Sequence, residues 1–189
     1  LGWGQTTLAN YKFENNLTVE AGAIGSPVLT FSIAPTYNAG VTGVALSTGT
    51  AASANGAFVE ITISTTGYSG ITVSWAGRTS NATTPGSWVL TGDSGSGYGS
   101  SIYTQSLTTS FVNTGNVALS SAFDNNSSIK LRITSTNPSL RNLRIDDLII
   151  NKTEQKVFRA GNEIALTLKE FQLLVYLAEA QGRTVSGPG

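Results

Sequence analysis

The sequence predicts a mainly β protein: an antiparallel β-sandwich of the jelly-roll type, followed by a small tail of one β-hairpin and one α-helix. Short segments in which apolar and polar residues alternate recur along the first 150 residues, with turn residues between them. No apolar pattern with helical spacing occurs before about residue 165. These two observations predict the sandwich, and a change of composition near residue 152 predicts that the tail is a separate unit.

The change of composition is sharp. Residues 1–150 hold 13 charged side chains and 43 Ser or Thr, whereas residues 151–189 hold 9 charged side chains and 4 Ser or Thr. Low charge with many hydroxyl side chains is typical of secreted β proteins. We therefore expect a sandwich domain over residues 1–152 and a hairpin and helix tail over residues 153–189.

The alternating segments justify the strands in chain order. Apolar residues occupy every second position from Ala9 in the first strand, and alternation is cleanest in residues 57–64 and 71–76, where Trp75 faces inward. Residues 34–55 are rich in Gly, Ala and Thr and are expected to be mostly loop. The expected strands are 7–13, 26–33, 44–46, 57–64, 71–76, 87–91, 102–107, 117–119, 128–135 and 143–150.

The inward positions of these strands predict the hydrophobic core. The residues expected to be buried are Val59, Ile61, Ile63, Ile71, Val73, Trp75, Ile129, Leu131, Ile133 and Ile145.

The last strand, residues 143–150, carries apolar residues on both faces if it alternates strictly. One face then holds Leu143, Ile145, Asp147 and Ile149, and the other holds Arg144, Asp146, Leu148 and Ile150. This pattern predicts a central strand that is packed on both sides. Two adjacent carboxylates inside such a strand are costly unless something binds them.

The tail has the pattern of a hairpin followed by a helix. Residues 156–166 are expected to turn at Gly161 and Asn162, and the helix is expected over 168–181. Thr167 and Glu170 have the spacing of a capping box. The apolar stripe at helical spacing consists of Phe171, Leu174, Val175 and Ala178.

Composition excludes several classes of function. The chain has no Cys and no His, which excludes disulfides, Ser-His-Asp triads and His-ligated zinc sites. The 11 basic and 11 acidic side chains cancel, so nucleic acid and acidic membranes are not attracted by net charge. No run of 18 apolar residues is present, so we expect no membrane span. The sequence favours a protein that is not an enzyme.

Residues 7–152 resemble the secreted jelly-roll modules, similar to lectins and carbohydrate-binding modules, of large surface proteins of Bacteroidetes and related bacteria. The segments that carry this resemblance are 8–14, 58–68, 71–78 and 143–148. The resemblance implies a non-catalytic extracellular module for cell-surface adhesion or glycan binding, with a glycan or a cell-surface component as partner. It implies a secreted or bacterial cell-surface location. The alternative is a self-assembling subunit of a surface filament or layer, whose partners are other copies of itself.

Residues 156–186 resemble the N-terminal part of the winged-helix domain of OmpR/PhoB-type response regulators. Residues 163–174 and 182–186 carry this resemblance. The family reads DNA with a recognition helix that would follow residue 186, and the last residue of the sequence is Gly189. We therefore expect no nucleic-acid partner. The second alternative is a fragment of a DNA-binding transcriptional regulator fused to a β-domain.

The resemblance to jelly-roll modules also implies a structural calcium site. Many jelly-roll carbohydrate-binding modules place an Asp from the last strand beside an N-terminal Phe-Glu segment, and Asp146, Asp147 and Glu14 match this pattern. Calcium takes six to eight oxygen ligands, which carboxylates and carbonyls supply. The alternative is that one aspartate is exposed and the other accepts hydrogen bonds from the backbone or from Arg.

Three residues are candidates for ligand binding. Trp88 and Tyr98 offer rings on which a sugar could stack, since both are close to a Gly/Ser-rich loop; the alternative for Trp88 is a place in the core. Asp93 in that loop is either an acid of a glycosidase or a turn residue. A glycosidase needs a second carboxylate about 5–10 Å away, and residues 1–150 contain only 7 acids.

Overall fold

The computed structural model describes most of the sandwich and parts of the tail. The described residues are 2–14, 16–20, 23–34, 36–41, 43–48, 55–80, 86–136, 142–159, 162–164, 166, 169–170, 173–174 and 176–177.

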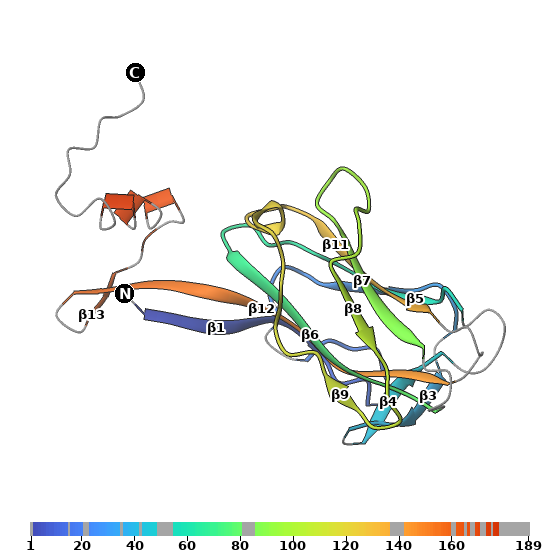
Figure 1. Ribbon diagram of the computed structural model, residues 1–189. Helices are drawn as coiled ribbons and strands as arrows, with labels where there is room; N and C mark the ends of the chain where they lie inside the picture. Colours follow the sequence, from blue (N-terminus) through green and yellow to red (C-terminus); the bar gives the residue numbers. More distant parts are fainter. Residues whose placement is uncertain are drawn as a thin grey trace.

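Two antiparallel sheets face each other and form the predicted jelly-roll sandwich (Figure 1). The five-stranded sheet has the order β2-β5-β11-β7-β8, and the eight-stranded sheet has the order β10-β6-β12-β4-β3, with β1 and β13 on β12 and β9 on β6. The strands are β1 (Gly2–Tyr11), β2 (Val28–Phe31), β3 (Thr36–Ala39), β4 (Val44–Ser47), β5 (Phe58–Ile63), β6 (Ser69–Thr79), β7 (Ser87–Asp93), β8 (Tyr103–Ser106), β9 (Val112–Asn113), β10 (Val117–Ala118), β11 (Ile129–Thr136), β12 (Leu143–Arg159) and β13 (Asn162–Ile164). A 3-10 turn, η2 (Ser121–Phe123), precedes β11.

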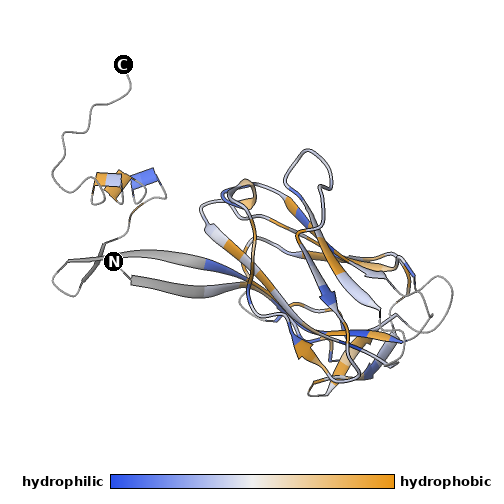
Figure 2. Ribbon diagram, in the orientation of Figure 1, coloured by the Kyte–Doolittle hydropathy of each residue, from blue (hydrophilic) through white to orange (hydrophobic). Residues whose placement is uncertain are grey.

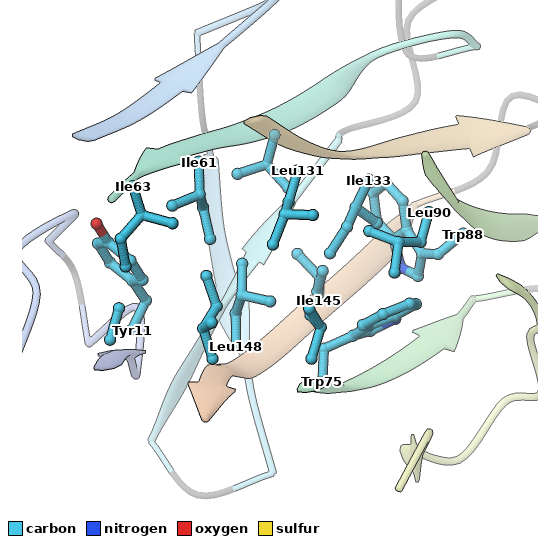
Figure 3. Close-up of a cluster of buried hydrophobic side chains, with 14 of the residues drawn as sticks. Tyr11, Ile61, Ile63, Trp75, Trp88, Leu90, Leu131, Ile133, Ile145 and Leu148 are labelled. Carbon is cyan, nitrogen blue, oxygen red and sulfur yellow. The ribbon is translucent and has the colours of Figure 1, made fainter. Parts of the chain in front are cut away.

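Apolar side chains from the facing sides of both sheets form one core (Figure 3). Figure 2 shows hydrophobic residues, in orange, on strands of both sheets. All ten residues predicted for the core are buried, and Trp75 is completely buried. The indole N–H of Trp75 donates to Gln105 Oε1 at 2.7 Å, so the polar atom of this large ring has a partner inside the core. Strict alternation within β5, β6 and β11 is what makes these positions predictable.

Strand β12 departs from the predicted alternation. The pairing of β12 with β6 shifts between Asp146 and Ile149, and Asp147 has φ +47°, in the left-handed region. This bulge turns Leu148 and Ile150 toward the core, where both are completely buried. The buried apolar residues of this strand therefore share one face, instead of occupying both as predicted, and Arg144 and the buried Asp146 lie on the other.

Three further segments differ from the sequence-based expectation. Strand β1 begins at Gly2 and pairs with β12 as far as Lys156, instead of beginning at residue 7. Strand β3 lies in the expected loop over 34–55 and pairs with β4, which confirms the strand predicted at 44–46. The short strand β9 was not predicted, because its two residues give no periodic pattern.

The hairpin of the tail agrees with the prediction. Residues Val157–Arg159 pair with Asn162–Ile164, which confirms the hairpin. Strand β12 runs without a break across the predicted domain boundary at 152–153. Most of the predicted helix falls on residues outside the described ones; positions 169, 170, 173, 174, 176 and 177 are helical. Within the described residues, no helix has the length and apolar character needed to cross a membrane.

Candidate functional site

Four side chains meet on the outer face of the five-stranded sheet, and we call them the Arg132 cluster: Phe58, Glu60, Tyr98 and Arg132. Glu60 on β5 and Arg132 on β11 are direct cross-strand partners, and Phe58 lies two residues before Glu60 on the same face. Tyr98 comes from the loop between β7 and β8. Alternation turns these residues away from the core, because Val59, Ile61, Leu131 and Ile133 occupy the inward positions.

The guanidinium group of Arg132 is held on three sides. Arg132 Nε and Nη2 donate to Glu60 Oε2 at 2.9 and 2.6 Å. The guanidinium carbon lies 4.1 Å from the ring centroid of Phe58 and 4.1 Å from that of Tyr98. The Tyr98 hydroxyl donates to the same Glu60 oxygen. Cation–π contacts and a charge-assisted hydrogen bond therefore fix two rings and one cation in a single arrangement.

The ionisation states of Glu60 and Tyr98 do not change near neutral pH. Burial opposes ionisation of Glu60, but hydrogen bonds from Tyr98 and Arg132 and the charges of Arg132 and Lys130 lower its pKa. Burial and the neighbouring Glu60 carboxylate raise the pKa of Tyr98 to about 12. Glu60 is therefore an anion and Tyr98 a neutral hydroxyl under ordinary conditions.

Asp93 shapes the loop that carries Tyr98. Asp93 Oδ1 accepts hydrogen bonds from the backbone N–H of Gly95 at 2.7 Å and of Gly97 at 2.9 Å. These backbone hydrogen bonds lower the pKa of Asp93. This geometry is that of a turn residue, one of the two alternatives for Asp93, and the turn holds the loop that leads to Tyr98.

Trp88 lies inside the sandwich and is 3% exposed (Figure 3). Its indole N–H donates to the carbonyl oxygen of Arg144 at 3.0 Å, and its ring lines a small apolar pocket with Phe31, Leu46 and Val59. A sugar can stack only on a ring face that reaches solvent. The expectation that Trp88 offers such a face is therefore corrected: Trp88 faces inward on β7, in the same layer as Leu90.

The three acidic residues predicted for a metal site come together around the hairpin of β3 and β4. Asp146 Oδ2 accepts from the N–H of Val41 at 2.8 Å, and Glu14 Oε2 accepts from the N–H of Val44 at 3.1 Å. Asp146 Oδ1 accepts from the N–H of Asp147 at 3.0 Å. The turn of this hairpin thus lies between carboxylates from the N-terminal segment and from the last strand of the sandwich.

Two features set this acidic group apart: the pKa of Asp146 is raised, and the position of Gly43 beside Glu14 has no room for a side chain. Asp146 is 1% exposed, and burial together with the charges of Asp147 and Glu14 raises its pKa to about 6. Gly43 has φ +69°, and a Cβ there would collide with the Glu14 carboxylate, so only glycine fits. Among the described residues, no three acidic side chains are arranged to hold one metal ion. A cation here would have to take further oxygen ligands from backbone carbonyls and water.

Sequence reasoning missed most of the Arg132 cluster. It identified Tyr98 but not Phe58, Glu60 or Arg132. The sequence held one clue: Glu60 and Arg132 both occupy outward positions in strands where apolar and polar residues alternate. Alternation does not say which residues lie opposite each other, however, and only the register of β5 against β11 brings Glu60 and Arg132 together.

Comparison with known proteins supports the fold. No family model matches the chain, and no curated protein matches its sequence. The CBM22-1 xylan-binding domain of Xyn10C from Paenibacillus barcinonensis is similar in structure, with a TM-score of 0.51 and 14% identity, over 78% of this chain and 94% of that domain. A cleaved adhesin domain of Lys-gingipain from Porphyromonas gingivalis has a TM-score of 0.53 and 10% identity, over 78% of this chain and 99% of that domain. The chain is thus a jelly-roll sandwich similar to carbohydrate-binding and adhesin domains.

Proposed function

We propose that this protein is a non-catalytic module that binds glycans through the outer face of its five-stranded sheet. The observation that carries the proposal is the Arg132 cluster, in which two aromatic rings and a guanidinium group are held in place by Glu60. Groups that are fixed before binding lose little entropy when a ligand arrives.

The surroundings of the cluster suit a sugar. A sugar ring has apolar C–H faces and a rim of hydroxyls, so it needs both aromatic surface and hydrogen-bonding groups. Thr91 lies opposite Arg132 on β7, and Thr134 lies opposite Phe58 on β11, both on the same outer face. Tyr98 itself combines an apolar ring with a polar end.

The acids with altered pKa values do not form a hydrolytic pair. Cleavage of a glycoside needs two accessible carboxylates on either side of the bond. Glu60 is ion-paired with Arg132, Asp93 is bonded to backbone amides, and Asp146 is 1% exposed with both oxygens bonded. This arrangement supports binding without catalysis.

The structural neighbours favour the same proposal. One is named for binding xylan and the other is an adhesin domain. A polysaccharide ligand and a secreted or surface location are therefore proposed for this chain. Adhesion is the cellular role that such binding would serve. Self-association stays a prediction.

A panel of soluble polysaccharides tests the proposal. Affinity gel electrophoresis should retard the wild-type chain with at least one neutral member of the panel, and calorimetry should then give its affinity. Tyr98→Ala is expected to weaken this binding about tenfold or more, because a central tyrosine of a binding surface is a typical hot spot. Tyr98→Phe separates the hydroxyl from the ring, and Tyr176→Ala, at an exposed tyrosine in the tail, is the matched control. The proposal fails if no polysaccharide binds or if Tyr98→Ala binds as wild type does.

A structural calcium ion is the proposed cofactor. Its support is that Glu14 and Asp146 reach the same hairpin and that burial, together with the neighbouring negative charges, disfavours ionisation of Asp146. The ion would supply positive charge between these carboxylates and tie the N-terminal segment to β12. The remaining ligands would be carbonyl oxygens and water.

Calcium should therefore raise the melting temperature. A ligand that binds only the folded state at about 100 times its Kd adds about 2.7 kcal/mol, or about 8 °C for a domain of this size. The increase should be smaller at about pH 5.5 than at about pH 7.5, because a proton competes with the metal for Asp146 below its pKa of about 6. Asp146→Asn should remove the effect, and Glu20→Gln, a control at a half-exposed acid, should keep it. Identical melting curves in calcium and in EDTA would exclude the site.

A further inference from the structure

Two arginines lie side by side on the outer face of the eight-stranded sheet, opposite the face that carries the Arg132 cluster. Arg78 on β6 and Arg144 on β12 are direct cross-strand partners. The residues that flank them in sequence face the core: Thr79, Leu143 and Ile145 are completely buried. Both arginine side chains therefore lie on the outer side of the sheet.

The arrangement is electrostatically unfavourable as it stands. Like charges directly opposite each other destabilise a sheet. The Nε atoms of Arg78 and Arg144 are buried and have no hydrogen-bond partner in the described part of the chain. Arg144 Nη1 donates to the carbonyl oxygen of Ala39 at 2.8 Å, and Arg78 lies over the Phe111 ring at 5.7 Å. Neither contact supplies a negative charge.

The described residues of the sandwich do not pair either arginine with an acid. The ion pairs between described residues join Lys12 to Glu20 and Arg132 to Glu60. Asp146 follows Arg144 by two residues, but its oxygens accept from the amides of Val41 and Asp147. Residues 49–54, 81–85 and 137–141, which the structure does not describe, contain no Asp or Glu.

We infer that Arg78 and Arg144 bind a carboxylate from outside the chain, namely that of a uronic acid in an acidic polysaccharide. Each guanidinium group is a planar fork that matches the two oxygens of a carboxylate, and the two positive charges lie on neighbouring strands of one face, where both attract the same anion. The Phe111 ring beside Arg78 supplies apolar surface for the sugar ring that carries it. The choice of a sugar as the carrier rests on the proposed function, whereas the anion site rests on the arginine pair alone.

Matched ligands separate the carboxylate from the sugar. Oligogalacturonate, its methyl ester, and dextran sulfate should be titrated into the full chain by calorimetry at low salt. We expect oligogalacturonate to bind at least tenfold more tightly than the methyl ester, in which the charge is removed and the sugar is kept. Binding should weaken as salt rises, because the site is exposed to screening. Dextran sulfate is expected to bind more weakly than oligogalacturonate.

Variants locate the site on the arginine pair. Arg78→Gln and Arg144→Lys should each weaken oligogalacturonate binding about tenfold, the first by removing a charge and the second by removing the planar fork. Lys12→Ala, a control that removes an exposed positive charge elsewhere, should bind as wild type does. Arg78→Gln should also melt no lower than wild type without ligand, because it relieves the repulsion between the pair; a purely structural arginine would lower the melting temperature.

The outcomes distinguish this inference from the proposed function. Binding of neutral polysaccharide without binding of oligogalacturonate overturns the inference and leaves the proposed function intact. Unchanged oligogalacturonate affinity in Arg78→Gln and Arg144→Lys overturns the assignment to these residues. Tighter binding of dextran sulfate than of oligogalacturonate overturns the choice of a carboxylate.

Discussion

Trp75→Ala is expected to lower the free energy of unfolding by about 5 kcal/mol, the largest destabilisation that we expect from a single substitution in this chain. Trp75 is completely buried and packs edge-on against Tyr103, with ring centroids 5.9 Å apart. Removing a buried tryptophan costs about 3–5 kcal/mol through lost contacts and the cavity left behind. The change also leaves Gln105 Oε1 buried without the donor that now lies 2.7 Å away. Urea unfolding followed by circular dichroism measures the loss.

Trp75→Phe is the matched control. Phenylalanine keeps most of the ring but has no N–H for Gln105, so it should cost about 2 kcal/mol. The slope of unfolding against urea should stay unchanged in both variants, since the same surface is exposed on unfolding. A loss below about 1 kcal/mol for Trp75→Ala would contradict the place of this ring in the core.

Arg132→Met is expected to lower the free energy of unfolding by about 2–3 kcal/mol at neutral pH. Methionine keeps the aliphatic stem but leaves Glu60, whose side chain is 11% exposed, without its cation. Breaking a buried ion pair on one side costs about 3–5 kcal/mol, and the 31% exposure of Arg132 reduces that figure. Lys130→Met, an exposed neighbour on the same strand, should change stability by less than about 0.5 kcal/mol.

The pH dependence of this difference has a definite sign. Arg132 and Tyr98 lower the pKa of Glu60 in the folded wild type, so the stabilisation is present above the ordinary pKa of 4.5 and is lost as the pH falls below it. The gap in stability between wild type and Arg132→Met should therefore shrink on acidification. A gap that stays constant from about pH 7 to about pH 3 would show that packing, not the charge of Glu60, accounts for the loss.

The sites were predictable to different degrees. The acidic group could be predicted because its members are adjacent in sequence, as Asp146 and Asp147 are, or match a familiar Phe-Glu segment, as Glu14 does. The Arg132 cluster and the arginine pair could not, because each joins residues that are more than 60 positions apart. Trp88 shows the opposite error: its Gly/Ser-rich neighbours indicated exposure, yet its position on β7 faces the core.

Local pattern was enough to predict the fold class, the alternating strands β5, β6 and β11 and the core residues that they contribute, because an alternation of period two is a local property of the chain. Which residues lie opposite each other depends on the folded sheets. The register of the paired strands places Glu60 opposite Arg132 and Arg78 opposite Arg144. The bulge at Asp147 had the same kind of effect: one extra residue in β12 reverses the direction of the side chains that follow it directly, so Leu148 and Ile150 enter the core. The left-handed conformation of Asp147 costs free energy, and the burial of Leu148 and Ile150 offsets that cost. No pattern within the strand reveals this exchange.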